Sequence, residues 1–227
     1  YLRSIILEIA LDIEHYSKLK LLHCLENNKS EDGYSIVNDF MVNQGQNKQG
    51  IEKRILEKCN SCYVGDIIRH YDGNYPAWTL IEIISFGDYL KFYKFCADRW
   101  NDKDLLNDFY LMKDVKALRN AAAHNNCILN DITIKDSKHK TNHAVKISLK
   151  TIKHQRNDKH LSKEKTRQIV TLLYTSIHII TSEGVKSKIK NQLIFFKKRV
   201  YRDYNYDFNP KLKATFDYLF DAIDIYY

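Results

Sequence analysis

Arg119 and His124 lie five positions apart in the middle of the chain, inside a segment that otherwise favours a helix. An arginine can hold two phosphate oxygens through parallel hydrogen bonds, and a histidine can accept or donate a proton near neutral pH. RNA supplies its own nucleophile, the 2′-hydroxyl beside the scissile phosphate. Arg119 and His124 are therefore candidate catalytic residues for RNA cleavage that needs no metal and leaves 2′,3′-cyclic phosphate and 5′-hydroxyl ends. The alternative, which spacing alone favours, is a surface arginine and a histidine packed near the end of the helix.

The spacing also predicts how such a site is assembled. Successive helical residues are rotated by about 100°, so side chains five apart diverge by roughly 140°. One helix therefore does not direct Arg119 and His124 tightly at one phosphate, whereas two copies facing each other across a two-fold axis can do so. Asn120 shares a helix face with His124 and is expected to position either group. The alanines at 121–123 leave room for a partner helix, and we expect a homodimer.

The elements that must position these residues are mostly helical. Glycine and proline are scarce, at 7 and 2 of 227 residues, which disfavours a many-stranded fold. Ser162 is expected to cap one helix and Asn209-Pro210 another. Apolar residues at helical spacing predict helices over 2–27, 47–60, 62–71, 76–86, 89–100, 102–126, 185–203 and 210–224, and a further helix that Ser162 opens and Gly184 ends. The fold class is therefore predicted to be all-α.

Residues 131–161 are a basic excursion from this helical pattern. Val145, Ile147 and Leu149 alternate with polar residues, which suits a short strand in a small hairpin, although a helical turn is the alternative. We predict a helical core over 1–130, a basic insertion or loop over 131–161, and C-terminal helices over 162–227 that pack on the core.

The basic side chains are expected either to contact an RNA backbone or to form a solvated surface. Those assigned to RNA binding are Lys135, Lys138, Lys140, Lys146, Lys150, Lys153, Arg156, Lys197, Lys198 and Arg199. The net charge of +8 and the isoelectric point near 9.1 favour nucleic acid over a membrane as partner.

The remaining composition limits the class of protein. No apolar run approaches the roughly 18 residues of a membrane span, so no membrane partner is expected. Five scattered cysteines fit a reducing cytoplasm. Cys59 and Cys62, with His70 nearby, resemble half a zinc site, but no second pair follows, so neither a metal nor a cofactor is expected. The chain opens at Tyr1 inside an amphipathic pattern, and we expect a segment to precede it.

Three segments resemble one known family. Leu118-Arg119-Asn120-Ala121-Ala122-Ala123-His124-Asn125-Asn126 resembles the LRN-x-x-AH segment of the Abi-like (AbiD/AbiF) abortive-infection family, which carries the R-x4-H signature of HEPN ribonucleases. Upstream, residues 75–88 resemble that family's P-x-W-x-x-x-E-x-x-x-F-G element, and residues 2–14 resemble its first HEPN helix. The resemblance covers residues 1 to about 130, with the elements in the right order and spacing.

The resemblance implies a HEPN-type helical bundle, antiphage defence by a toxin-like effector, and an endoribonuclease site at a dimer interface. In the AbiF branch it also implies a structured noncoding RNA partner. We expect Glu82, Asn125 and Asn126 to support this site, Glu82 by anchoring Arg119 or orienting the site; the alternative for Glu82 is an exposed helical residue. Many relatives carry a second histidine where this chain has Asn125, so one candidate proton carrier is missing. The alternative function is an RNA-binding HEPN module, a ribonucleoprotein component that grips RNA without cutting it.

Overall fold

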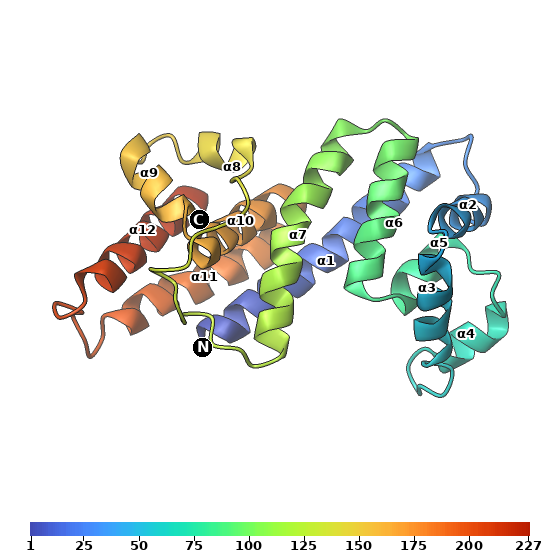
Figure 1. The fold of residues 1–227 in the computed structure, drawn as a ribbon, viewed down its shortest axis with the longest axis horizontal. Coiled ribbons are helices and arrows are strands. Elements are labelled where there is room, and N and C mark those ends of the chain that lie inside the picture. The colour runs from blue at the N-terminus through green and yellow to red at the C-terminus, as the bar shows by residue number, and fades with distance from the viewer. The chain divides into compact units, whose positions relative to one another are not determined.

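The computed structural model describes residues 1–227 and contains twelve helices and no strands (Figure 1). The helices are α1 (Leu2–Asn27), α2 (Ser35–Asn43), α3 (Asn47–Leu56), α4 (Gly65–Tyr71), α5 (Ala77–Ile83), α6 (Phe86–Arg99), α7 (Lys103–Ala123), α8 (His143–Ser148), α9 (His154–Leu161), α10 (Glu164–Ile179), α11 (Glu183–Val200) and α12 (Pro210–Tyr226). The prediction of an all-α fold is confirmed.

The chain forms two compact units. The first comprises Tyr1–Tyr16 and Tyr110–Tyr227, and the second comprises Ser17–Phe109. Helices α1 and α7 each contribute one part to each unit. The division into three segments at residues 130 and 161 stays a prediction.

Buried aromatic rings and the buried carboxylate of Asp108 organise the second unit. Phe40 on α2 meets Phe92 on α6 edge to face, with 5.1 Å between ring centroids. Asp108, near the start of α7, is fully buried and accepts hydrogen bonds from Lys20 (2.5 Å) and from the hydroxyl of Tyr93 (3.2 Å). Burial and the nearby Asp108 carboxylate raise the pKa of Tyr93. These bonds satisfy a charge that would otherwise be costly to bury.

The corner between α5 and α6 is held by Asp88. Ser85 caps α6 by accepting a hydrogen bond from the Asp88 N–H (3.1 Å). Arg54 of α3 donates to both carboxylate oxygens of Asp88 (2.9 and 2.8 Å), and Lys91 donates a further bond (2.9 Å). Burial alone would raise the pKa of Asp88, but the bonds from Lys91, Ser85 and Arg54 outweigh burial and lower it. The corner is therefore locked to α3 by a charged network.

The ring of Trp78 leaves no room for a side chain at Gly33. A Cβ atom at Gly33 would lie 2.4 Å from Cζ3 of Trp78, which packs edge to face on Tyr34. We expect Gly33→Ala to lower the free energy of unfolding by about 1–3 kcal/mol, because the indole must move. The matched control is Gly184→Ala in the first turn of α11, where the nearest atom would be 3.7 Å away. Urea denaturation measures both, and equal losses would contradict the close-packing explanation.

In the first unit, α10 is the central helix. It packs against α8, α9 and α12, and its Arg167 is buried at 2% exposure. Arg167 donates hydrogen bonds to both carboxylate oxygens of Asp114 on α7, to Glu164 (2.9 Å) and to Ser137 (2.9 Å). The buried guanidinium of Arg167 therefore ties α7 to α10.

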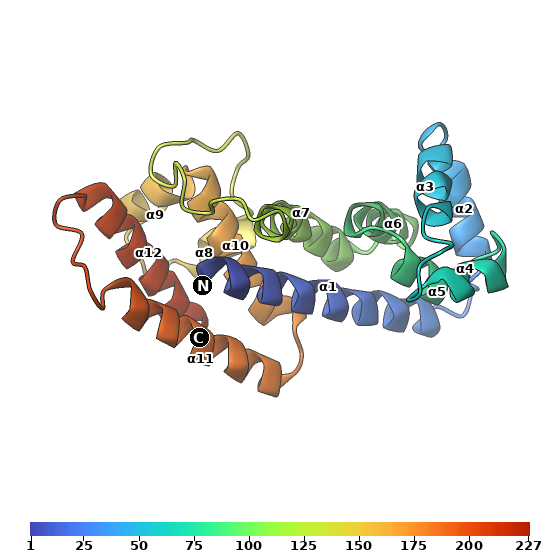
Figure 2. The same cartoon turned by 90° about the horizontal axis from the view of Figure 1, so that it is seen from below.

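Helices α11 and α12 run side by side, joined by a loop at one end (Figure 2), with Phe196 and Phe220 in contact across the pair.

The structure contradicts a strand over 145–149 and confirms the alternative, a helical turn. Residues 143–148 form helix α8, in which Val145 is buried while Ile147 is 52% exposed. Residues four apart share one helix face, so Val145 and Leu149 are both buried, as they would be on one face of a strand. The stretch 131–161 contains no hairpin, and its only β-type pairing is the isolated bridge from Asp136 to Lys163.

Two other predictions about elements are corrected. Ser162 does not open a helix but ends α9, and Lys163 takes the N-cap position of α10. Gly184 does not end that helix either, because α10 ends at Ile179 and Gly184 lies in the first turn of α11. Helix α2 lies in a stretch for which the sequence predicted no helix. The predicted cap of the last helix is confirmed, because Asn209 accepts a hydrogen bond from the Leu212 N–H (3.1 Å) and Pro210 begins α12.

Candidate functional site

The Arg-x4-His segment lies at the C-terminal end of α7, and the helix ends one residue before His124. The Asn126 N–H donates to the carbonyl of Ala121 (2.9 Å), and the Asn125 N–H donates to the carbonyl of Ala122 (3.2 Å). Asn125 has a positive φ of 58°. These bonds form a Schellman motif, in which a residue in the left-handed region terminates the helix. The prediction that the helix continues to Asn126 is therefore wrong, and Asn125 and Asn126 form the helix end.

The left-handed conformation of Asn125 gives a direct test of this helix end. We expect Asn125→Ala to lower the free energy of unfolding by about 1 kcal/mol, because an alanine Cβ is disfavoured at positive φ. Asn125→Gly should be neutral or stabilising, since glycine is the usual residue at this position. Urea denaturation of both variants measures the difference. A glycine variant as unstable as the alanine variant would show that the Asn125 side chain, and not its backbone, holds the turn.

Arg119 is half-buried on α7 and faces a carboxylate from α1. Its Nη2 atom lies 3.9 Å from Oε2 of Glu14, and the exposed fractions of the two side chains are 31% and 15%. The Nη1 atom donates a long hydrogen bond, 3.4 Å, to Oδ1 of Asn120. Asn120 thus contacts Arg119, in keeping with its predicted positioning role. No sequence pattern indicated Glu14 as the partner of Arg119, apart from the resemblance of residues 2–14 to the family's first helix.

The guanidinium of Arg119 is only partly satisfied. Its Nε atom is buried and has no hydrogen-bond partner. A buried donor without an acceptor costs free energy, so such groups are rare in native proteins. Since both other contacts of Arg119 are long, the guanidinium keeps donor capacity for an anion.

His124 is exposed, and no hydrogen bond joins its ring to Arg119. The helix end beside it is tied to α1, because Nη1 of Arg3 donates to the carbonyl of Asn125 (3.2 Å). A cation at this position also compensates the partial negative charge of a helix C-terminus. Arg3 is a second contributor that spacing alone did not indicate. Within one chain, the side chains of Arg119 and His124 are therefore not hydrogen-bonded to each other, which agrees with their predicted divergence.

Glu82, predicted as a supporting residue, is exposed and forms a 3.7 Å ion pair with Lys18. Both belong to the second unit, Glu82 on α5 and Lys18 on α1. The carboxylate that the structure places beside Arg119 is Glu14. A role for Glu82 in supporting the Arg-x4-His segment stays a prediction.

The residues predicted to bind RNA fall into three groups. Three are paired with carboxylates: Lys146 with Asp158 (3.3 Å), Arg156 with Asp221, and Lys197 with Asp224 (2.6 Å). Arg199 lies over the ring of Tyr1, at 5.7 Å from its centroid. The remaining six are exposed and form no ion pair, namely Lys135, Lys138, Lys140, Lys150, Lys153 and Lys198. The positive charge available to an RNA backbone on this list is therefore smaller than the sequence implied.

The cysteines do not form a metal site in the structure. All five cysteines carry free thiols, and no group of three or more His, Cys, Asp or Glu side chains is close enough to hold a metal ion. Cys59 and Cys62 therefore have no third His, Cys, Asp or Glu side chain near enough to form a metal site with them. None of the helices has both the length and the apolar character that crossing a membrane requires.

Together these features describe an all-α protein whose candidate site is an arginine and a histidine at the end of one helix. Residues 1–130, more than half of the chain, match the family described as Abi-like protein, and the chain belongs to this family. The family assignment made from the sequence is thereby confirmed. Membership suggests a role in abortive infection, a form of phage defence. No curated protein and no solved structure was found to match the chain.

Proposed function

We propose that this protein is a metal-independent HEPN endoribonuclease that acts as an effector of an abortive-infection system. The observation that carries the proposal is Arg119, which is half-buried beside Glu14, keeps a buried Nε without an acceptor, and precedes the exposed His124 at the end of α7. Family membership supports the defence role. The net charge of +8 supports a polyanionic substrate.

In the proposed reaction, the 2′-hydroxyl of RNA attacks the adjacent phosphorus, and the bond from phosphorus to the 5′-oxygen breaks. The products are a 2′,3′-cyclic phosphate and a 5′-hydroxyl. One His124 accepts the proton of the 2′-hydroxyl, and a second His124 donates a proton to the leaving 5′-oxygen. Arg119 binds the non-bridging oxygens, where negative charge accumulates in the transition state, and Asn120 orients the guanidinium.

Two copies of the chain supply the two histidines in this proposal. Side chains five apart on one helix diverge, and no hydrogen bond joins Arg119 to His124 within one chain. A two-fold axis beside the end of α7 would bring both pairs to one phosphate. We further propose that the effector associates with a structured noncoding RNA, as the AbiF resemblance implies, through its exposed lysines.

The experiment that tests this function is end-mapping of RNA. The protein is purified without nuclease treatment and incubated with RNA in the presence of EDTA, beside an Arg119→Ala/His124→Ala variant. We expect cyclic phosphate ends with the wild-type protein and none with the variant. A discrete RNA that stays intact and is bound equally by both proteins would overturn the nuclease proposal and support a module that only binds RNA.

A further inference from the structure

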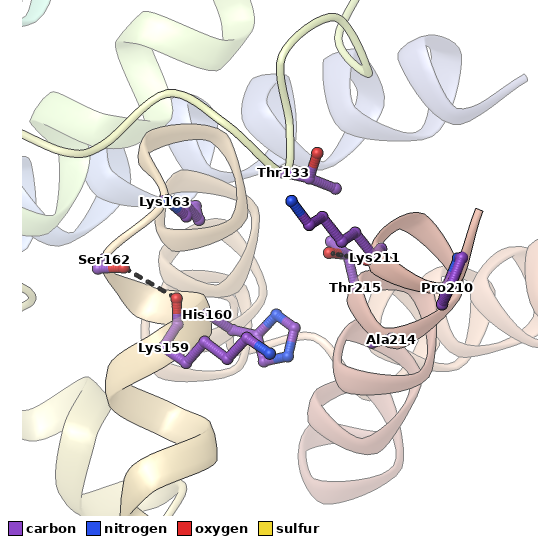
Figure 3. Close-up of a pocket in the computed structure, with 9 residues that line it drawn as sticks. All are labelled: Thr133, Lys159, His160, Ser162, Lys163, Pro210, Lys211, Ala214 and Thr215. Carbon is purple, nitrogen blue, oxygen red and sulfur yellow. Dashed lines mark hydrogen bonds between the residues drawn. The ribbon is translucent and has the colours of Figure 1, made fainter.

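A pocket of about 460 Å³ lies in the first unit, between the end of α9, the start of α12 and the segment that follows α7. This volume is within the range of pockets that hold small ligands, about 300–1,000 Å³. Figure 3 shows Lys159 and His160 extending from α9 toward α12, and Lys211 extending from α12 toward Thr133. The pocket contains none of the residues proposed for cleavage.

The charge of the pocket is positive and largely uncompensated. Lys159, Lys163 and Lys211 line it, and no carboxylate does. Lys163 is paired with Asp136 (2.7 Å), whereas neither Lys159 nor Lys211 forms an ion pair. Two lysines that line the pocket, Lys159 and Lys211, therefore carry positive charge without an ion-pair partner. A phosphate monoester carries a charge of about −1.5 to −2 at neutral pH, whereas each phosphate in a nucleic-acid backbone carries about −1. The charge of the two unpaired lysines therefore matches a phosphate monoester better than a backbone phosphate.

The position of Lys211 supports an anionic ligand independently. It lies in the first turn of α12, directly after Pro210, and that turn contains no acidic residue. The N-terminus of a helix carries partial positive charge, so a lysine there is unfavourable unless an anion is bound. The Thr215 hydroxyl donates to the carbonyl of Lys211 (2.9 Å).

His160 adds a neutral polar group to the same pocket. It is buried, with its ring stacked on Tyr218 at 4.5 Å between centroids. Burial, together with the nearby Arg156 and Lys159, lowers the pKa of His160 to about 4. The ring is therefore uncharged at neutral pH and can donate or accept a hydrogen bond without adding a third positive charge. The pocket thus combines charge with a fixed polar group.

We propose that this pocket binds the phosphate monoester of a nucleotide, either free or at the end of an RNA chain. Lys159 and Lys211 neutralise the phosphate, and His160 and Thr133 supply neutral hydrogen-bonding groups. The site goes beyond the cleavage proposed above and does not depend on it, since Arg119 and His124 are not part of the pocket.

Isothermal titration calorimetry with inorganic phosphate, adenosine 5′-monophosphate and adenosine tests the site. We expect the two phosphate compounds to bind and adenosine not to bind. Lys159→Met/Lys211→Met should weaken binding at least about tenfold, because each lysine contributes a charge-assisted interaction. The matched control, Lys53→Met/Lys103→Met, removes two exposed lysines outside the pocket and should stay within about twofold, since distant charges are screened by salt.

The source of the phosphate is distinguished with 2′-O-methylated oligonucleotides, which lack the nucleophile for cleavage. Tighter binding of the 5′-phosphorylated oligonucleotide than of its 5′-hydroxyl form would assign the site to an RNA end. Equal binding of both forms, with the monophosphate still bound, would assign it to a free nucleotide. The proposal is overturned if neither phosphate compound binds, if adenosine binds as tightly as its monophosphate, or if the pocket variant matches the wild type. Arg119→Ala/His124→Ala should bind the monophosphate normally, so failure of the cleavage proposal leaves this result unchanged.

Discussion

Arg119→Ala is expected to reduce the rate of RNA cleavage by about 10²–10³-fold, the usual cost of removing one group that stabilises transition-state charge. The physical reason is that Arg119 is held against Glu14 and Asn120 while its guanidinium keeps donor capacity for phosphate oxygens. Single-turnover cleavage of a labelled RNA, with protein in excess, measures the chemical step. The control is Arg202→Ala, which removes an exposed arginine that is paired only with its neighbour Asp203.

Two further substitutions separate charge from geometry at this position. Arg119→Lys keeps the positive charge but loses the planar fork, so it should recover only part of the lost rate. Glu14→Gln keeps the shape of the side chain that faces Arg119 but removes its charge, and it should reduce the cleavage rate less than Arg119→Ala does. If Arg119→Ala folds normally and cleaves at the wild-type rate, Arg119 is not part of the site.

The double variant Arg119→Ala/His124→Ala should reduce the cleavage rate by a much smaller factor than the product of the reductions in the two single variants. The reason is that the rate effects of groups that act as a unit are not additive.

Local sequence signals predicted the elements best where one stripe of apolar residues was long. The range 2–27 matches α1, and the Asn209-Pro210 signal marks the start of α12. Short segments were predicted less well, because a strand and a single helical turn both place residues four apart on one face. Residues 145–149 are the example. The cap of α8 resolves the ambiguity, since the Asn142 side chain accepts a hydrogen bond from the Ala144 N–H (2.8 Å).

The sequence indicated the central residues of the candidate site but not the residues that surround them. Spacing within one helix identified Arg119, Asn120 and His124 as a group, but Glu14 comes from α1 and is distant in sequence. The same limit applies to charge. Arg156 and Lys197 belong to basic clusters in the sequence, yet the last helix neutralises both through carboxylates. Such pairings depend on how helices pack, and no local pattern encodes them.

Arg167→Ala is expected to lower the free energy of unfolding by about 3–5 kcal/mol, the usual cost of breaking a buried ion pair by removing one partner. Arg167 is 2% exposed and donates hydrogen bonds to Asp114 on α7 and to Glu164. Without the guanidinium, both carboxylates would remain largely buried without compensation. Urea denaturation monitored by circular dichroism measures the loss. The exposed Arg202→Ala serves again as the control and should cost no more than about 0.5 kcal/mol.

The pH dependence of this difference identifies its cause. Burial alone would raise the pKa of Glu164, but hydrogen bonds from Ser137 and Arg167 and the charge of Arg167 outweigh it and lower the pKa below its ordinary value of 4.5. A carboxyl whose pKa is lower in the folded state contributes stability above the unfolded-state pKa and loses it as pH falls through the folded-state pKa. The gap between wild type and Arg167→Ala should therefore be largest near neutral pH and narrow as pH falls below about 4.5. A gap that does not change with pH would assign the loss to packing around the arginine stem, and not to its charge.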